Sequence, residues 1–174
     1  MSASLPQLAH SIATLPRCLI SGLHVLGLLA LSAFTASPQP WDAVVAADGT
    51  AQYRTVQDAI NAAPQTTTAA RRWTIYIHAG VYHELLYVQR EKHFVSLVGE
   101  DPLRTVLSYD LNATMPGADQ LPIGTFRTPS TQIDADDFSA ENLTFENSAG
   151  PVGQALAVRV DGDRVVFRNC RFLS

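Results

Sequence analysis

Two clusters of aspartates supply the residue type that acid–base and nucleophilic catalysis uses. They are Asp134 with Asp136 and Asp137, and Asp161 with Asp163. The second cluster lies in the stretch VDGDR between two apolar segments, where the Asp-Gly pair can supply a positive φ and the carboxylates can face water. The stretch DADDF around the first cluster likewise predicts a turn. Spacing therefore favours turns over a catalytic dyad at both places.

Three histidines, His78, His83 and His93, are the next candidates because they lie within sixteen residues. His78 and His83 flank a Gly turn, and the spacing of the three matches no zinc signature. Surface or hydrogen-bonded histidines are therefore favoured, and we expect no metal ion and no other cofactor. The chain also lacks a Gly-x-Ser-x-Gly elbow, a Walker loop and a dinucleotide-binding fingerprint.

The remaining candidate is Gln154, an uncharged polar residue directly before the apolar stretch ALAV. Gln154 could be a polar residue at the start of a strand without a further role, or it could be a hydrogen-bond donor in a binding or catalytic site. Spacing alone does not decide between the two.

The elements that must position these residues are one short helix and a series of strands. The stretch TVQDAINAAP places Val56, Ala59, Ile60 and Ala63 on one helical face, with a threonine cap and a closing proline. After this helix, short apolar segments alternate with turn residues at close spacing, and residues 112–129 read as a long loop.

Two of the strand segments resemble each other at an offset of 27 residues. Asn142 superposes on Asn169, and Phe145 superposes on Phe172. A helix-free repeat of this length suits one coil of a parallel β-helix, in which equal positions stack and the asparagines form a ladder. A β-sandwich would give similar short strands, but the paired Asn and Phe positions favour the β-helix.

The composition and the N-terminal residues indicate which partners and which cellular location to expect. The 174 residues carry 12 basic and 16 acidic side chains, a net charge of -4, with no basic stripe, so nucleic acid is an unexpected partner. Arg17 is followed by an apolar run, Cys18–Ala36, and a small-residue exit. This pattern predicts a signal peptide over residues 1–37, and a retained membrane anchor is the alternative. After cleavage, residues 38–174 would form a secreted or periplasmic domain without membrane contact.

Seven stretches then resemble the pectinesterase (pectin methylesterase) family. They are VVAADGTAQYRTVQDAINAAP, TIYIHAGVYHE, VSLVGED, TVLS, GTFRTPST, ENLTFENSAGP and GQALAVRVDGDRVVFRNCRFLS. The resemblance covers Val44 to Ser174, the N-terminal portion of the family pattern, and its Gly-Gln-Ala form is similar to bacterial members.

The resemblance implies an all-β fold, a right-handed parallel β-helix with one short N-terminal helix, of which this chain holds the first coils. It implies hydrolysis of methyl esters in homogalacturonan without a metal: one aspartate attacks the ester carbonyl and a second acts as acid and base. Carried over by position, Gln154 matches a family glutamine that stabilises the oxyanion and binds substrate, and Thr125 matches a substrate-contacting threonine. Phe126 is a further candidate for the cleft.

In the family pattern, a QDTL stretch with the second glutamine and the acid aspartate follows the segment that here reads CRFLS. We therefore expect no catalytic aspartate in this chain, no esterase activity from it alone, and self-association through an open β-helix end. A non-catalytic polysaccharide-binding β-helix is the alternative. A pectate lyase would need acidic calcium ligands and basic residues in clusters that the sequence lacks.

Overall fold

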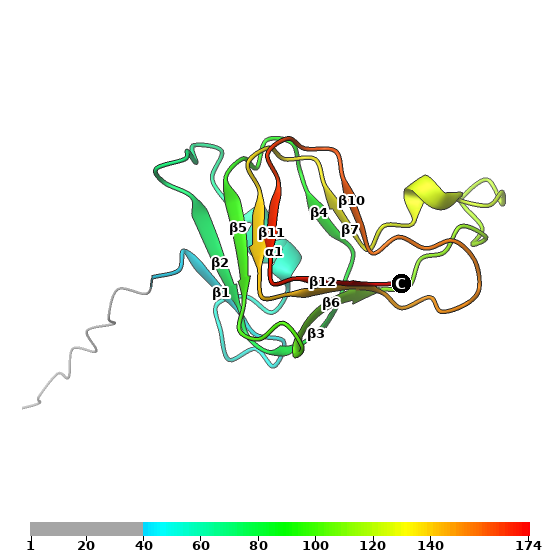
Figure 1. The fold of residues 1–174 in the computed structure, drawn as a ribbon, viewed down its shortest axis with the longest axis horizontal. Coiled ribbons are helices and arrows are strands. Elements are labelled where there is room, and N and C mark those ends of the chain that lie inside the picture. The colour runs from blue at the N-terminus through cyan, green and yellow to red at the C-terminus, as the bar shows by residue number, and fades with distance from the viewer. Residues whose placement is uncertain (1–39) are drawn as a thin grey trace, which may run out of the picture. The chain divides into compact units, whose positions relative to one another are not determined.

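The strands of this chain wind into a right-handed parallel β-helix (Figure 1). The computed structural model describes residues 40–174. The expected leader, residues 1–37, with Cys18, lies outside the described residues. The three complete coils, β2–β4, β5–β7 and β8–β10, each contribute one strand to each of three sheets. Within the described residues every pairing between named strands is parallel. The predicted fold class is confirmed, and the sandwich alternative is wrong.

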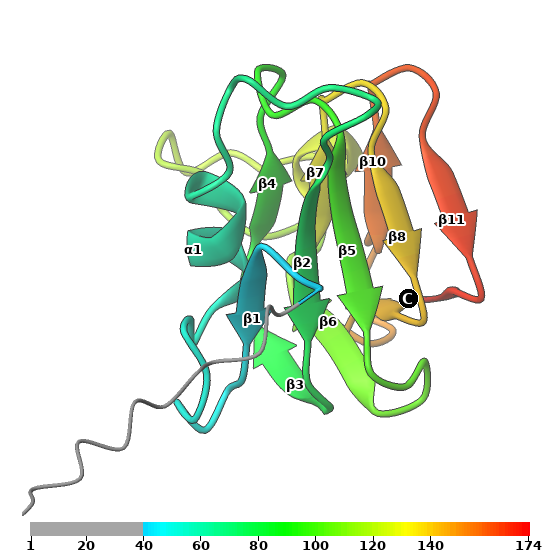
Figure 2. The same cartoon turned by 90° about the vertical axis from the view of Figure 1, so that its left-hand side faces the viewer.

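In the longest sheet, side chains alternate between the interior of the β-helix and its outer surface. In β2 the side chains of Ile75 and Ile77 are buried, while Tyr76 between them faces outward, as a period of two requires. Figure 2 shows this sheet face-on, with its strands side by side. In spatial order its strands are β1 (Ala43–Val45), β2 (Trp73–Ile77), β5 (Val95–Gly99), β8 (Ser139–Glu141) and β11 (Val166–Arg168).

The other two sheets complete the three sides of each coil. One contains β4 (Leu86–Val88), β7 (Thr131–Ile133) and β10 (Val158–Val160). The other contains β3 (Gly80–His83), β6 (Thr105–Tyr109), β9 (Thr144–Asn147) and β12 (Arg171–Leu173).

The core consists of inward side chains that stack from coil to coil. In one column Tyr82, Leu107, Phe145 and Phe172 are register partners in turn. The rings of Phe145 and Phe172 are stacked, with centroids 5.6 Å apart and an interplanar angle of 9°, and Phe167 meets both edge-on. Burial of each such side chain contributes roughly 1.5–3 kcal/mol, so the repeated apolar position is the main source of stability.

The asparagine ladder predicted from the repeat is present. Asn169 Nδ2 donates to Asn142 Oδ1 at 2.7 Å, and both residues have positive φ, 50° and 56°. Asparagine tolerates this left-handed conformation better than most residues, which explains its place at the corner between two sheets.

The turn VDGDR differs from its prediction in one respect. The residue with positive φ is Arg164 (53°), one coil above Asp137 (57°), and not Gly162. A glycine is needed at position 162 for a different reason: a Cβ there would lie 2.1 Å from the carbonyl oxygen of Ala135 in the coil below. The aspartates do lie in turns, as expected.

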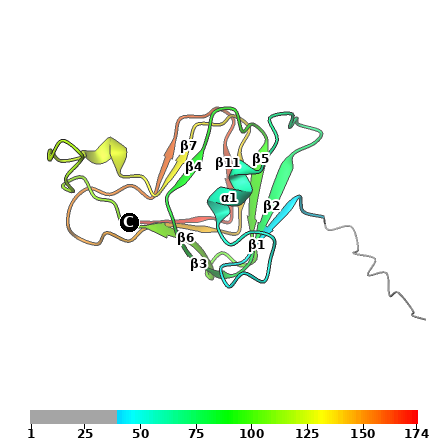
Figure 3. The ribbon, with the colours of Figure 1, turned by 180° about the vertical axis from the view of Figure 1, so that it is seen from behind.

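The short helix α1 (Val56–Asn61) is confirmed and covers the first coils on the side seen in Figure 3. Thr55 caps it by accepting a hydrogen bond from the Asp58 N–H, and Val56, Ala59 and Ile60 are buried. The carboxylate of Glu84 accepts from two further N–H groups of the first turn, at 2.8 and 3.0 Å. Within residues 40–174 no helix is both long and apolar enough to cross a bilayer.

Candidate functional site

Two long connections leave the β-helix on the same side (Figure 1): residues 110–130, between β6 and β7, and residues 148–157, between β9 and β10. The backbone joins them directly, because the Ala113 N–H donates to the Gln154 carbonyl at 2.8 Å. Within the first loop, the Ala113 carbonyl accepts from the Gly124 N–H at 3.0 Å. The two loops therefore form one surface beside the sheet of β4, β7 and β10.

A buried amide fixes the base of both loops. Asn147, 3% exposed, has its Nδ2 within 2.8–3.1 Å of the carbonyl oxygens of Leu111, Thr128 and Leu156. The first two carbonyls belong to one loop and the third to the other. Breaking this junction would leave buried polar groups without partners, which is why it holds the loops in place.

Gln154 and Thr125 meet on this surface. The Thr125 hydroxyl donates to Gln154 Oε1, which leaves the amide N–H groups of Gln154 available to other acceptors. Gln154 is exposed, and it lines an open hollow of about 530 Å³ together with Gly150, Gly153 and Ser174. Among the described residues its hydrogen bonds go to Thr125 and Ala113, and none goes to a carboxylate.

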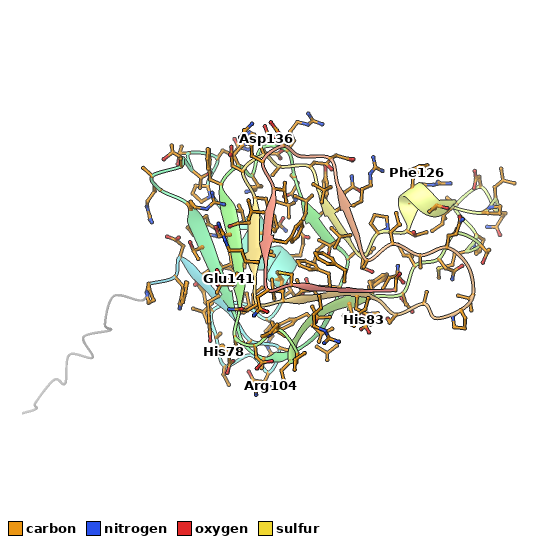
Figure 4. The ribbon with its side chains drawn as sticks, viewed as in Figure 1. His78, His83, Arg104, Phe126, Asp136 and Glu141 are labelled. Atoms are coloured by element: carbon orange, nitrogen blue, oxygen red, sulfur yellow. The ribbon has the colours of Figure 1, made fainter. Side chains whose placement is uncertain are left out.

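Local backbone geometry places Thr125. Gly124 has φ of 74°, a left-handed conformation that favours glycine, and the chain then forms the single 3-10 turn η1 (Thr125–Arg127). The Thr128 hydroxyl and N–H both donate to the Thr125 carbonyl and close the turn. Phe126 projects from η1 with 77% of its surface exposed (Figure 4).

The carboxylates that the sequence singled out are held in turns by other partners. The guanidinium of Arg164 donates to Asp137 at 2.8 and 2.9 Å and lowers the pKa of that carboxyl, and it also contacts Asp163 at 2.6 Å. Asp161 pairs with Arg159 at 2.7 Å, and Asp134 accepts from the Tyr87 hydroxyl at 2.8 Å. The interpretation of these residues as turn residues is supported.

Two of the three candidate histidines have separate acidic partners. His78 Nδ1 lies 3.1 Å from Glu100, and His83 Nε2 lies 3.9 Å from Asp110. Within the part of the chain that the structure describes, no group of three or more His, Cys, Asp or Glu side chains could hold a metal ion.

Two positioning residues were missed by sequence reasoning. Asn147 lies at the end of a strand, where an asparagine suggests only a turn. Arg159 lies on the outer face of β10, where its Nη1 donates to the Phe126 carbonyl at 3.2 Å and so ties η1 to the sheet. The hydrogen bonds of both side chains join segments that are remote in sequence, so no local sequence pattern predicts them.

Comparison with known proteins gives the family. The family model "Pectinesterase" matches residues 42–174. The chain belongs to the pectinesterase family. It is 41% identical over 134 residues to Pectinesterase 31 of Arabidopsis thaliana, covering 74% of this chain and 42% of that protein.

Solved structures agree. Pectin methylesterase from carrot is 32% identical with a TM-score of 0.68, covering 78% of this chain and 40% of that one. A pectin methylesterase in complex with a hexasaccharide is 29% identical with a TM-score of 0.68, covering 76% of this chain and 43% of that one. The chain spans 21% of Arabidopsis Pectinesterase 5 and 42% of Pectinesterase 31, which is less than half of each of these curated relatives. The expected likeness to bacterial members in particular stays a prediction.

Proposed function

We propose that this chain is the N-terminal part of a working pectinesterase that hydrolyses methyl esters of homogalacturonan, releasing methanol and leaving a galacturonate carboxylate. The observation that carries the proposal is the Thr125–Gln154 pair, on an exposed surface built by two loops of a pectinesterase-family β-helix. A solved relative binds a hexasaccharide, which supports a pectin-type polysaccharide as the ligand.

In the proposed reaction Gln154 stabilises the oxyanion. Attack of an aspartate carboxylate on the ester carbonyl moves an electron pair onto the carbonyl oxygen, and the Gln154 amide N–H donates to that oxygen. Methoxide then leaves as methanol with a proton from an acid, which gives a mixed anhydride between the galacturonate carboxyl and the aspartate. Water hydrolyses this anhydride, which releases the galacturonate carboxylate and regenerates the aspartate. We assign neither aspartate to a residue of this chain, because the aspartates of the two clusters are held by other partners in and beside their turns.

Thr125 acts by orienting Gln154. Because its hydroxyl occupies Oε1, the amide is held with Nε2 free to donate, which is the orientation an oxyanion requires. A donor fixed before the reaction costs no reorganisation when charge develops. Removal of one such donor lowers kcat about 10²–10³-fold in a serine protease, and we expect an effect of that order here.

The test is a methanol-release assay on highly methyl-esterified pectin, using the longest natural form of the protein that contains residues 40–174. Methanol and new carboxylate should appear in equal amounts, with no unsaturated product. Binding without methanol would instead support the non-catalytic alternative, and an unsaturated product would indicate a lyase. The absence of activity from the 174-residue chain by itself, its export and its self-association stay predictions.

A further inference from the structure

The hydroxyl of Thr128 contacts both of the loops that carry the Thr125–Gln154 pair. Thr128 directly follows η1 and is 0% exposed, and its Oγ1 donates to the Thr125 carbonyl at 2.8 Å. The same Oγ1 accepts from the N–H of Leu156, two residues beyond Gln154 in the other loop, at 3.2 Å. One buried oxygen therefore connects the turn that carries Thr125 to the segment that carries Gln154.

These contacts and the chain together form a closed ring. From the Thr125 hydroxyl the ring passes to the Gln154 side chain and along the chain to Leu156. It then returns through the Thr128 hydroxyl to the Thr125 carbonyl. Water competes for the exposed Thr125–Gln154 hydrogen bond, whereas the Thr128 hydroxyl is out of contact with solvent. The buried side of the ring therefore fixes how far Thr125 lies from Gln154.

Both ends of this buried side are also attached to the β-helix by bonds that do not use the Thr128 hydroxyl. The Thr128 carbonyl accepts from Asn147 Nδ2 at 3.0 Å. The Leu156 carbonyl accepts from Asn147 Nδ2 at 3.1 Å and from the Ser130 N–H at 3.0 Å. Loss of the hydroxyl alone should therefore change the spacing of the two loops and leave them attached to the fold.

Thr131, three residues later, carries the same side chain in a different situation. It is 1% exposed, and among the residues that the structure describes its Oγ1 is buried without a hydrogen-bond partner. Replacement of a hydroxyl that bonds nothing by the methyl group of valine removes no contact. Thr131→Val is therefore a matched control for Thr128→Val.

We propose that Thr128 is a positioning residue for ester hydrolysis, because its hydroxyl sets the separation of Thr125 and Gln154 and so the direction of the Gln154 amide. The proposal rests on the proposed function and deepens it, since it concerns the same oxyanion donor. Thr128 is buried and acts on the reaction only through Gln154. A misplacement of about 1 Å at a reacting centre can cost about 10²-fold in rate, so a partial displacement of the amide should cost about tenfold.

The test is the measurement of kcat and KM for methanol release from methyl-esterified pectin, in the longest natural form of the protein that contains residues 40–174. Thr128→Val should lower kcat about tenfold per folded molecule and change KM by less than about twofold. Thr128→Ser keeps the hydroxyl and should retain most of kcat. Thr131→Val should leave both constants unchanged.

A second comparison asks whether Thr128 acts through Gln154. In the Gln154→Ala background, Thr128→Val should change kcat by less than about twofold, because the donor that it positions is already gone. Equal losses in the two backgrounds would overturn the proposal. Full kcat for Thr128→Val, or a Thr128→Ser variant as slow as Thr128→Val, would overturn it as well.

Folding is followed by urea unfolding of each variant, and Thr128→Ala is the second variant without the hydroxyl. It leaves room for a water on the Leu156 N–H, and it should show the same loss of kcat as Thr128→Val. If neither variant folds, Thr128 is a structural residue and the proposal is wrong.

Nitrogen-15 relaxation of the Gln154 side-chain amide, in the 174-residue chain, gives a readout that needs no activity. The amide should be ordered in wild type, Thr128→Ser and Thr131→Val, and should gain fast motion in Thr128→Val. An amide equally ordered in Thr128→Val and wild type would contradict the positioning role. If wild type releases no methanol, the proposed function has failed, and the amide measurement alone decides whether Thr128 orients Gln154.

Discussion

Replacement of Phe145 by alanine should reveal how strongly one stacked core position stabilises this β-helix. Phe145 is 0% exposed, and its ring contacts Phe167 edge-on at 5.7 Å and Phe172 in a stack at 5.6 Å. Core Phe→Ala changes cost about 3–5 kcal/mol, from lost transfer energy and a residual cavity. Because Phe172 is 49% exposed, the site can partly collapse from that side, so we expect about 3 kcal/mol.

The assay is urea unfolding of the 174-residue chain, followed by far-ultraviolet circular dichroism and fitted for both midpoint and slope. The matched control is Phe126→Ala, the same substitution at a side chain that is 77% exposed, which should change the unfolding free energy by less than about 0.5 kcal/mol. A loss below about 1 kcal/mol at Phe145, or equal losses at the two sites, would refute the claim that stacked inward residues carry the stability.

Two further predictions concern a close approach and a buried carboxyl. Gly99→Ala should lower the free energy of unfolding by at least about 2 kcal/mol, because a Cβ there would lie 2.1 Å from the Asn142 carbonyl oxygen. The control is Gly80→Ala, where a Cβ would have no contact closer than 3.5 Å. Its free energy of unfolding should stay within about 1 kcal/mol of the wild-type value in the same urea assay. Burial raises the pKa of Glu84, more than its hydrogen bonds to the helix N–H groups lower it, so the folded state holds this proton more tightly than the unfolded state. Stability from this group is therefore greatest below the ordinary glutamate pKa of about 4.3 and declines as pH rises through the folded pKa. Glu84→Gln should remove that decline in unfolding curves measured from about pH 4 upward, and an unchanged pH dependence would contradict the assignment.

The sequence predicted the fold well where equivalent positions of successive coils carry the same residue type. The offset of 27 residues brought Asn142 to Asn169 and Phe145 to Phe172, and the structure confirms both pairs as coil-to-coil contacts. The turn at Gly162 was placed correctly but explained wrongly: the glycine is required by the carbonyl of the coil below, a contact that no local turn rule contains.

The candidate site was only partly predictable. Thr125 and Gln154 were selected because they match a family motif, and the structure adds that they contact each other across 29 residues. Spacing could not supply this contact, because two loops of irregular conformation have no periodicity to read. Asn147 and Arg159 act on these loops from strand ends and sheet faces, so their roles depend on tertiary packing.

The measurement that tests the account most directly is kcat for methanol release by Gln154→Ala, in the longest natural form of the protein, beside wild type and Gln52→Ala. Gln52 is an exposed glutamine outside the two loops, so its replacement controls for loss of a surface amide. We predict a fall of about 10²–10³-fold in kcat for Gln154→Ala, with KM changed little, the same unfolding curve as wild type, and full activity for Gln52→Ala. An unchanged kcat, or a lower kcat that follows from loss of folded protein, would contradict the role of Gln154 as the oxyanion donor.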